Sequence, residues 1–179
     1  MNEVIPSLPT PVIPSTPEAA TAQIPYKDPL EEIKKKLTPN EKEEFFKAFL
    51  ADKPYIEEET LFDGKMKVKF STLNMHQNNT ILLQMQYDQE AGIAKNNDAY
   101  LIKIIQYRIS ASLLEIDGKP FAPEFTEEKG AGKNQTYLVN KLKVMESWPI
   151  FKISSLTDVF NRFEKKVRAL TEESFKEPF

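Results

Sequence analysis

The acidic run Glu57, Glu58 and Glu59 and the single histidine, His76, are the side chains that could do acid–base chemistry or hold a divalent cation. However, neighbouring residues on an extended strand point to opposite faces. No second cluster of Asp, Glu, His or Cys stands at ligand spacing. We therefore expect no catalytic residue, no metal site and no enzyme. The competing interpretation is a small hydrolase or nuclease that uses residues 57–59 and His76.

Two basic motifs could bind phosphate. The run Lys34-Lys35-Lys36 has acidic neighbours three and four positions earlier, which is typical of a solvated, salt-bridged helix face. The motif Gly130-Ala131-Gly132-Lys133 is only superficially similar to a phosphate loop, because it lacks the preceding strand, the glycine spacing and the hydroxyl after lysine. We therefore expect no cofactor and no small-molecule substrate.

Composition restricts the class of protein further. The 179 residues include 24 basic and 27 acidic side chains, for a formal charge of −3, so we expect neither nucleic acid nor a membrane as partner. The absence of cysteine excludes disulfides and thiolate metal sites, and fits both a reducing cytosol and an assembly built there and later released. The first residues lack the basic and apolar regions of a signal peptide.

The most apolar stretch covers residues 98–114. Leu101, Ile104 and Ile105 share one side of a helix there, and other apolar side chains widen that surface around most of the circumference. Its 17 residues, with Lys103 and Arg108, fall short of the roughly 20 apolar residues of a membrane span. We predict a buried central helix that Asp117-Gly118 ends soon afterwards.

Two capped helices and a hairpin precede this stretch. Asp28-Pro29 and Thr38-Pro39-Asn40-Glu41 are N-terminal caps, and the second helix should turn four residues to the core, namely Phe45, Phe46, Phe49 and Leu50. Met66, Val68 and Phe70 then alternate with lysines after the turn residues Asp63-Gly64. This pattern predicts a β-hairpin at residues 55–72, with the acidic run opposite the lysine-bearing strand.

Three further helices are predicted. The first spans residues 73–91, with Asn78 or Asn79 as its cap and Leu73, Met75, Ile81, Leu82 and Met85 on its apolar side. The second spans residues 135–147 and faces inward with Leu138, Leu142 and Met145, after a long loop anchored by Phe121 and Phe125. The third begins at Ser155 and has the stripe Val159, Phe160, Phe163, Val167 and Leu170. The predicted fold is thus a mostly helical α+β domain at residues 28–179, a bundle of about six helices around residues 98–114.

Residues 1–27 form a separate, proline-rich segment, which we expect to be extended. Two interpretations remain open, a disordered tail and a docking arm whose apolar anchors bind a neighbour. The aromatic end of the chain likewise either folds back or contacts a partner. The partner-binding candidates are Ile5, Leu8, Val12, Ile13, Ile24, Tyr26, Phe175 and Phe179.

Three motifs within residues 55–175 resemble small tail-assembly and baseplate-hub proteins of tailed bacteriophages. These are Leu61-Phe62-Asp63-Gly64-Lys65 leading into an alternating strand, residues 110–119 at the end of the hydrophobic helix, and the closing pattern Leu156, Phe160, Phe163 and Leu170. The resemblance implies a non-enzymatic structural protein of a virion, assembled in the host cytoplasm within a larger oligomeric assembly. Its partners would be other virion structural proteins of the tail, baseplate hub or neck. The alternative is a soluble tail-assembly chaperone that leaves the particle.

Overall fold

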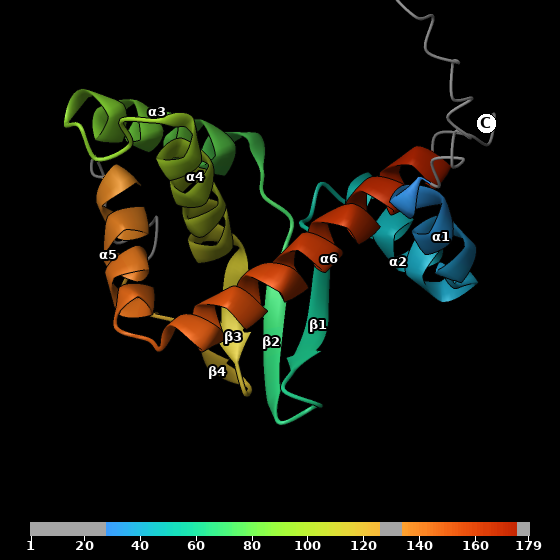
Figure 1. The fold of residues 1–179 in the computed structure, drawn as a ribbon. Helices are drawn as coiled ribbons and strands as arrows, with labels where there is room; N and C mark the ends of the chain where they lie inside the picture. Colours follow the sequence, from blue (N-terminus) through green and yellow to red (C-terminus); the bar gives the residue numbers. More distant parts are fainter. Residues whose placement is uncertain (1–27, 126–133, 175–179) are drawn as a thin grey trace, which may run out of the picture.

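A computed structural model describes residues 28–125 and 134–174 (Figure 1). The predicted arm at residues 1–27, the motif at residues 130–133 and residues 175–179 lie outside this part of the chain. The mostly helical α+β class is confirmed. Its elements are α1 (Pro29–Lys36), α2 (Pro39–Leu50), β1 (Ile56–Leu61), β2 (Met66–Ser71), α3 (Met75–Glu90), α4 (Asn97–Ser112), β3 (Leu113–Ile116), β4 (Lys119–Pro120), α5 (Asn134–Glu146) and α6 (Ile150–Ser174).

The longest helix, α6, organises the molecule. It crosses one face of the sheet, with α1 and α2 at its C-terminal end and α3, α4 and α5 beyond its N-terminal end (Figure 1). It contacts α1, α2, β1 and α4. Its predicted stripe is confirmed, because Val159, Phe160, Phe163 and Leu170 are buried. The helix begins at Ile150 rather than at the predicted Ser155, since the Pro149 carbonyl accepts the N–H of Lys152 at 2.9 Å and no break follows.

The prediction of a fully covered helix at residues 98–114 was wrong in two respects. The helix α4 ends at Ser112, because Leu113 opens β3 and pairs with Phe70 of β2. One side of its N-terminal half is also uncovered, with Leu101 56% and Ile102 57% exposed. The apolar residues therefore serve three purposes, namely core packing, strand pairing and an exposed surface.

The predicted hairpin is confirmed, within a four-stranded antiparallel sheet of order β1-β2-β3-β4. Asp63 and Gly64 have φ of 55° and 82°, as a tight turn with two left-handed residues requires, and the Lys65 N–H donates to the Phe62 carbonyl. Sequence reasoning missed β3 and β4. Asp117-Gly118, predicted to end a helix, instead forms the turn between these two strands.

Two buried clusters define two lobes. The sheet lobe comprises the four strands with α1, α2 and α6, and its core includes Val68, Phe70, Phe160 and Phe163. The helix lobe comprises α3, α4 and α5, and its core is Ile81, Met85, Ala94, Tyr107, Ala111, Tyr137, Leu138 and Leu142. Phe125 packs against both clusters, and the C-terminal ends of α4 and α5 reach the sheet-lobe core through Ile109 and Met145. Inward-facing Leu138, Leu142 and Met145 and the anchors Phe121 and Phe125 are therefore confirmed.

Local caps set where the helices begin. Asp28 and Thr38 cap α1 and α2 as predicted. For α3 the cap is Asn74 rather than Asn78 or Asn79, because Asn74 and Gln77 form a reciprocal capping box. More side chains of α2 and α3 were predicted to face the core than do so in the structure. Phe45 is buried on α2, while Phe49 and Leu50 are exposed; Ile81 and Met85 are buried on α3, while Met75 and Leu82 are exposed.

Candidate interaction surfaces

All of the predicted partner-binding residues lie outside the residues that the structure describes, so their role stays a prediction. They are Ile5, Leu8, Val12, Ile13, Ile24, Tyr26, Phe175 and Phe179. The candidate surfaces below are therefore built from other residues. Their positions depend on which faces of α3, α4 and α6 the fold leaves uncovered.

The acidic run on β1 divides between two faces. Glu58 points outward and pairs with Lys67 at 2.8 Å, as the predicted cross-strand charges require. Glu57 and Glu59 point toward α6, where they pair with Lys166 and Arg162. His76 lies in the first turn of α3. Within the described ranges, no group of three or more His, Cys, Asp or Glu side chains could hold a metal ion.

Lys166 joins three elements of the sheet lobe. Its Nζ lies 2.5 Å from a carboxylate oxygen of Glu41 on α2 and also contacts Glu57 on β1. Burial acts to raise the pKa of Glu41, but hydrogen bonds from Lys166 and from the Thr38 backbone and hydroxyl outweigh it and lower the pKa to about 2. Burial likewise acts to lower the pKa of Lys166, and its two carboxylate partners raise it. Each charge in this cluster has a partner, so the cluster holds α2 and β1 against α6.

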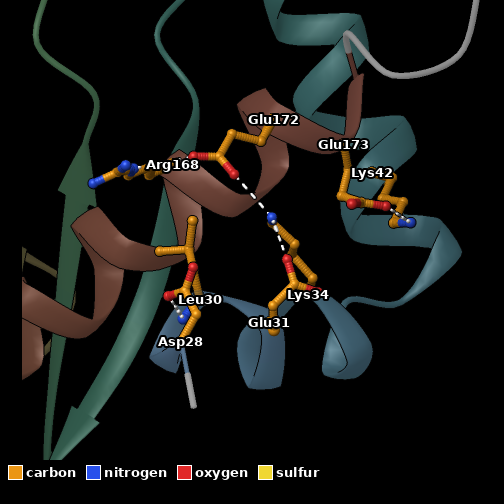
Figure 2. A network of polar contacts seen from close by, with 8 residues as sticks. All are labelled: Asp28, Leu30, Glu31, Lys34, Lys42, Arg168, Glu172 and Glu173. Carbon is orange, nitrogen blue, oxygen red and sulfur yellow. Dashed lines mark hydrogen bonds and ion pairs between the residues drawn. The ribbon is translucent and has the colours of Figure 1, made fainter. Parts of the chain in front are cut away.

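A second network fixes α1 and α2 to the end of α6 (Figure 2). Lys34 on α1 lies 2.7 Å from Glu31 and 2.9 Å from Glu172, and Glu172 also accepts a hydrogen bond from Arg168. Lys42 on α2 pairs with Glu173 at 3.3 Å. The predicted lysine run is thus part of a salt-bridged face.

A cleft of about 530 Å³ separates the lobes. One wall is α6 with Phe160, Phe163 and Val167, and the other is formed by the end of β2, the start of α3 and the C-terminal part of α4. An ion pair between Arg108 of α4 and Glu164 of α6 crosses it. Burial raises the pKa of the Glu164 carboxyl, and the Arg108 guanidinium offsets this only in part. Arg108 Nε is buried without a hydrogen-bond partner among the described residues.

Apolar side chains are exposed on both lobes, and two of these places involve α3, α4 and the start of α6. The first is the outer face of α3, with Met75, Leu82, Leu83 and Tyr87. The second is a hollow of about 300 Å³ between α4 and α6, here called the α4/α6 groove. Four isoleucines and four polar residues line it, namely Ile102, Ile105, Ile150, Ile153, Gln106, Ser154, Thr157 and Asp158. Phe151 lies beside it and packs edge-on against Phe62 of the hairpin turn, with 6.0 Å between ring centroids. Ile150 is 77% and Phe151 63% exposed, so the apolar side chains of this surface are open to solvent.

The sequence pattern did not identify these surfaces, although one feature of it indicated that apolar faces would be left exposed. The helices α3 and α4 carry apolar residues around most of their circumference, and a helix needs only one such face to join a core.

None of the described helices combines the length and apolarity of a membrane-spanning segment. No protein-family model, curated protein or solved structure matches the chain.

Proposed function

We propose that the protein is a non-enzymatic structural adaptor of a tailed-phage particle, in its tail, baseplate hub or neck. It is assembled in the host cytoplasm and joins neighbouring virion proteins. The observation that carries the adaptor role is the exposed α4/α6 groove with Phe151 beside it. The phage assignment rests on the resemblance of residues 55–175 to tail-assembly and baseplate-hub proteins.

The groove has the physical character of a protein-binding surface. Its side chains stand on two long helices, and Ile105 also packs against the sheet-lobe core. A partner that covers them removes apolar surface from water, which contributes roughly 25 cal/mol per Å². Because helices hold these side chains, binding orders few additional groups and less of that free energy is lost.

In this proposal the domain sets position and residues 1–27 link it to a neighbour. Six prolines restrict the unbound segment, so laying it on a partner costs less entropy than ordering a Gly/Ser linker. At about 3.1 Å per residue, an extended segment of this length reaches on the order of 80 Å. That distance is enough to cross one subunit and contact the next.

The groove is tested with Ile102→Glu, which places a charge on an exposed apolar site. We expect unchanged helical circular dichroism and about tenfold or greater loss of partner recovery in pulldowns from infected or co-expressing cells. Leu50→Glu is the matched control, since Leu50 is also exposed but lies on α2. Equal recovery by both variants would contradict a role for the groove.

The arm is tested by deleting residues 1–25. We expect unchanged helical circular dichroism but loss of stable incorporation into the assembly. If full-length and shortened proteins recover the same partners equally, the segment is not a docking arm. Mass spectrometry of purified particles distinguishes the two assembly roles, because only a virion component remains at fixed copy number and a chaperone leaves.

A further inference from the structure

The outer face of α3 is apolar and open to solvent in the part of the chain that the structure describes. The helix packs on α4 and α5 through its inner side, where Ile81 and Met85 are buried. On the opposite side Leu82, Leu83 and Tyr87 are 46%, 51% and 54% exposed. Figure 1 shows α3 at the end of the helix lobe that lies away from the sheet, so a second molecule can reach this face.

The exposed side chains form one stripe along the helix. Asn79, Leu83 and Gln86 follow one another at intervals of four and three residues, and exposed His76 and Glu90 continue the spacing toward the two ends. Alternating intervals of three and four residues are typical of helices that pack side by side along their length. The stripe is therefore suited to a partner helix that lies along α3 rather than across it.

This stripe carries little charge. Charged side chains make up 28% of the whole chain, but the 16 residues of α3 include only two, Asp88 and Glu90. Asp88 is buried, so Glu90 alone brings a formal charge to the exposed face of this helix. Protein interfaces are depleted of charge at their centre, whereas a solvated helix face usually carries several charged residues. The composition of the stripe therefore favours contact with protein.

The stripe has a similar order of side chains in both directions. Leu82 and Leu83 lie at the midpoint of α3 (Met75–Glu90), and the amides Asn79 and Gln86 lie at equal distances on either side of it. When two copies of α3 lie antiparallel about this midpoint, leucine meets leucine and Asn79 meets Gln86 of the second copy. The Asn79 amide can then donate a hydrogen bond to the Gln86 side-chain carbonyl.

The two ends of α3 are complementary in charge in the same arrangement. Glu90 is the last residue of the helix, where the carbonyl end is partially negative, and no basic residue lies in that turn. It accepts a hydrogen bond from the neutral side chain of Gln86 at 3.0 Å, which does not neutralise its charge. An antiparallel copy places its partially positive N-terminal turn beside Glu90, whereas a parallel copy would bring two Glu90 carboxylates together.

We propose that two copies of the protein associate through the outer face of α3, with the two helices antiparallel about a two-fold axis near Leu82 and Leu83. A second copy is the occupant because the apolar centre, the amides and the charged ends each meet a matching group in it. One helix from each copy is a small interface, so we expect a dissociation constant in the micromolar range. The contact uses neither helix of the α4/α6 groove, so it goes beyond the proposed adaptor role and does not depend on it.

Sedimentation of the full-length protein over a range of concentrations tests the association. We expect a reversible equilibrium between monomer and dimer. Leu83→Glu should raise its dissociation constant about tenfold or more, because two carboxylates then meet at the axis. Leu50→Glu is the matched control and should leave the constant unchanged, since Leu50 is also exposed but lies on α2. All these proteins should have the same helical circular dichroism.

A charge exchange at the axis provides a second measurement. Leu83→Lys alone should also weaken the dimer, because two ammonium groups then meet. An equimolar mixture of Leu83→Glu and Leu83→Lys should recover most of the association, since opposite charges face each other in the mixed dimer. A mixture no more associated than either variant alone would contradict a two-fold axis near this position.

Introduced thiols test the antiparallel register, and the cysteine-free sequence makes each of them unique. Proteins with Asn79→Cys and Gln86→Cys are oxidised separately and as an equimolar mixture, and the products are identified by mass. We expect the mixed disulfide at several times the yield of either symmetric one. The reason is that like positions in the antiparallel pair lie about 10 Å apart along the helix axis, at 1.5 Å per residue.

The remaining outcomes also decide the proposal. A wild-type protein that stays monomeric at millimolar concentration would overturn it, and so would a dimer that Leu83→Glu leaves intact. Symmetric disulfides as abundant as the mixed one would exclude the antiparallel arrangement. If the wild type is monomeric and Leu83→Glu instead reduces recovery of other proteins in pulldowns, α3 binds an unlike partner. The adaptor role is judged separately, by partner recovery with Ile102→Glu.

Discussion

The two lobes bury different kinds of interior. In the sheet lobe the rings of Phe70, Phe160 and Phe163 pack together, with centroids 5.4 to 6.2 Å apart. In the helix lobe a buried carboxylate, Asp88, accepts hydrogen bonds from the Tyr107 hydroxyl at 2.8 Å and from the Gln84 side chain at 3.0 Å. Both lobes expose large apolar side chains, on α3 and the start of α4 in the helix lobe and on α2, the hairpin and the start of α6 in the sheet lobe.

This difference separates stability from recognition. The sheet lobe buries a cluster of phenylalanine rings and joins α2 to α6 by an ion pair, so burial dominates its free energy of folding. The interior of the helix lobe includes a hydrogen-bonded polar group. We infer that the sheet lobe is the scaffold and that the helix lobe, with the start of α6, presents surfaces to partners.

The largest effect is expected from Phe160→Ala in the sheet lobe. Phe160 is 1% exposed, and removing its ring leaves a cavity between α6 and β2, at a cost of about 3–5 kcal/mol in the free energy of unfolding. Urea denaturation followed by circular dichroism measures this change. Leu83→Ala on the exposed face of α3 is the control and should change stability by about 0.5 kcal/mol or less. Similar losses for both variants would contradict the division into scaffold and recognition surface.

A smaller effect is expected from Asp88→Ala in the helix lobe. The substitution leaves the buried Tyr107 hydroxyl without its acceptor, which costs about 1–3 kcal/mol in the free energy of unfolding. The double variant Asp88→Ala/Tyr107→Phe removes both partners and should lose less than the sum of the two single changes. Thermal unfolding of all three variants measures the coupling. Strict additivity would show that the pair does not stabilise this interior.

Acid should weaken the sheet lobe through the Lys166 cluster. The pKa of Glu41 is lowered from 4.5 to about 2 in the folded protein, so this carboxylate stabilises the fold fully above pH 4.5. That contribution, about 1 kcal/mol after screening by solvent, is lost as the pH falls toward 2. Urea midpoints between pH 7 and pH 3 measure it. Glu41→Gln should show a smaller decrease over this range, and an equal decrease would exclude Glu41 as the source.

The smallest effect is expected from Lys67→Ala at the outer face of the sheet. The ion pair between Lys67 and Glu58 is about half exposed on both sides, so its loss should change the melting temperature very little. Thermal unfolding measures this change. A loss comparable to that of Asp88→Ala would mean that outward charges also support the scaffold, which weakens the contrast between the two lobes.

The elements that sequence predicts well are those whose signals are local. The caps at Asp28 and Thr38 and the turn at Asp63-Gly64 each depend on a few adjacent residues. Strand β3 depends instead on pairing with β2, more than 40 residues earlier, so its apolar residues look like the end of a helix. A helical period likewise cannot tell a face that meets a core from one that meets a partner, which explains the error at Leu101 and Ile102.

The candidate sites likewise depend on contacts between distant segments, which local sequence patterns do not reveal. The cleft combines Asn74, Arg108 and Glu164, which come from three elements and share no sequence motif. The α4/α6 groove joins two helices that lie about 50 residues apart in the chain, and its pairing of Ile102 with Ile150 follows from packing alone. Composition did reveal the unusual residues 1–27, because proline and aliphatic content needs no tertiary context.

The position of α6 in the chain has a consequence for biosynthesis. This helix covers Val68 and Phe70, yet it follows every other described element, and Ser174 lies 103 positions after Ser71. At about 5–20 residues per second, translation of that interval takes about 5–20 s. During this time the hairpin has emerged from the ribosome without its cover, and its apolar face is open to other chains. Stalled or shortened translation products that lack α6 should therefore aggregate or bind general chaperones, whereas the completed chain closes its own core.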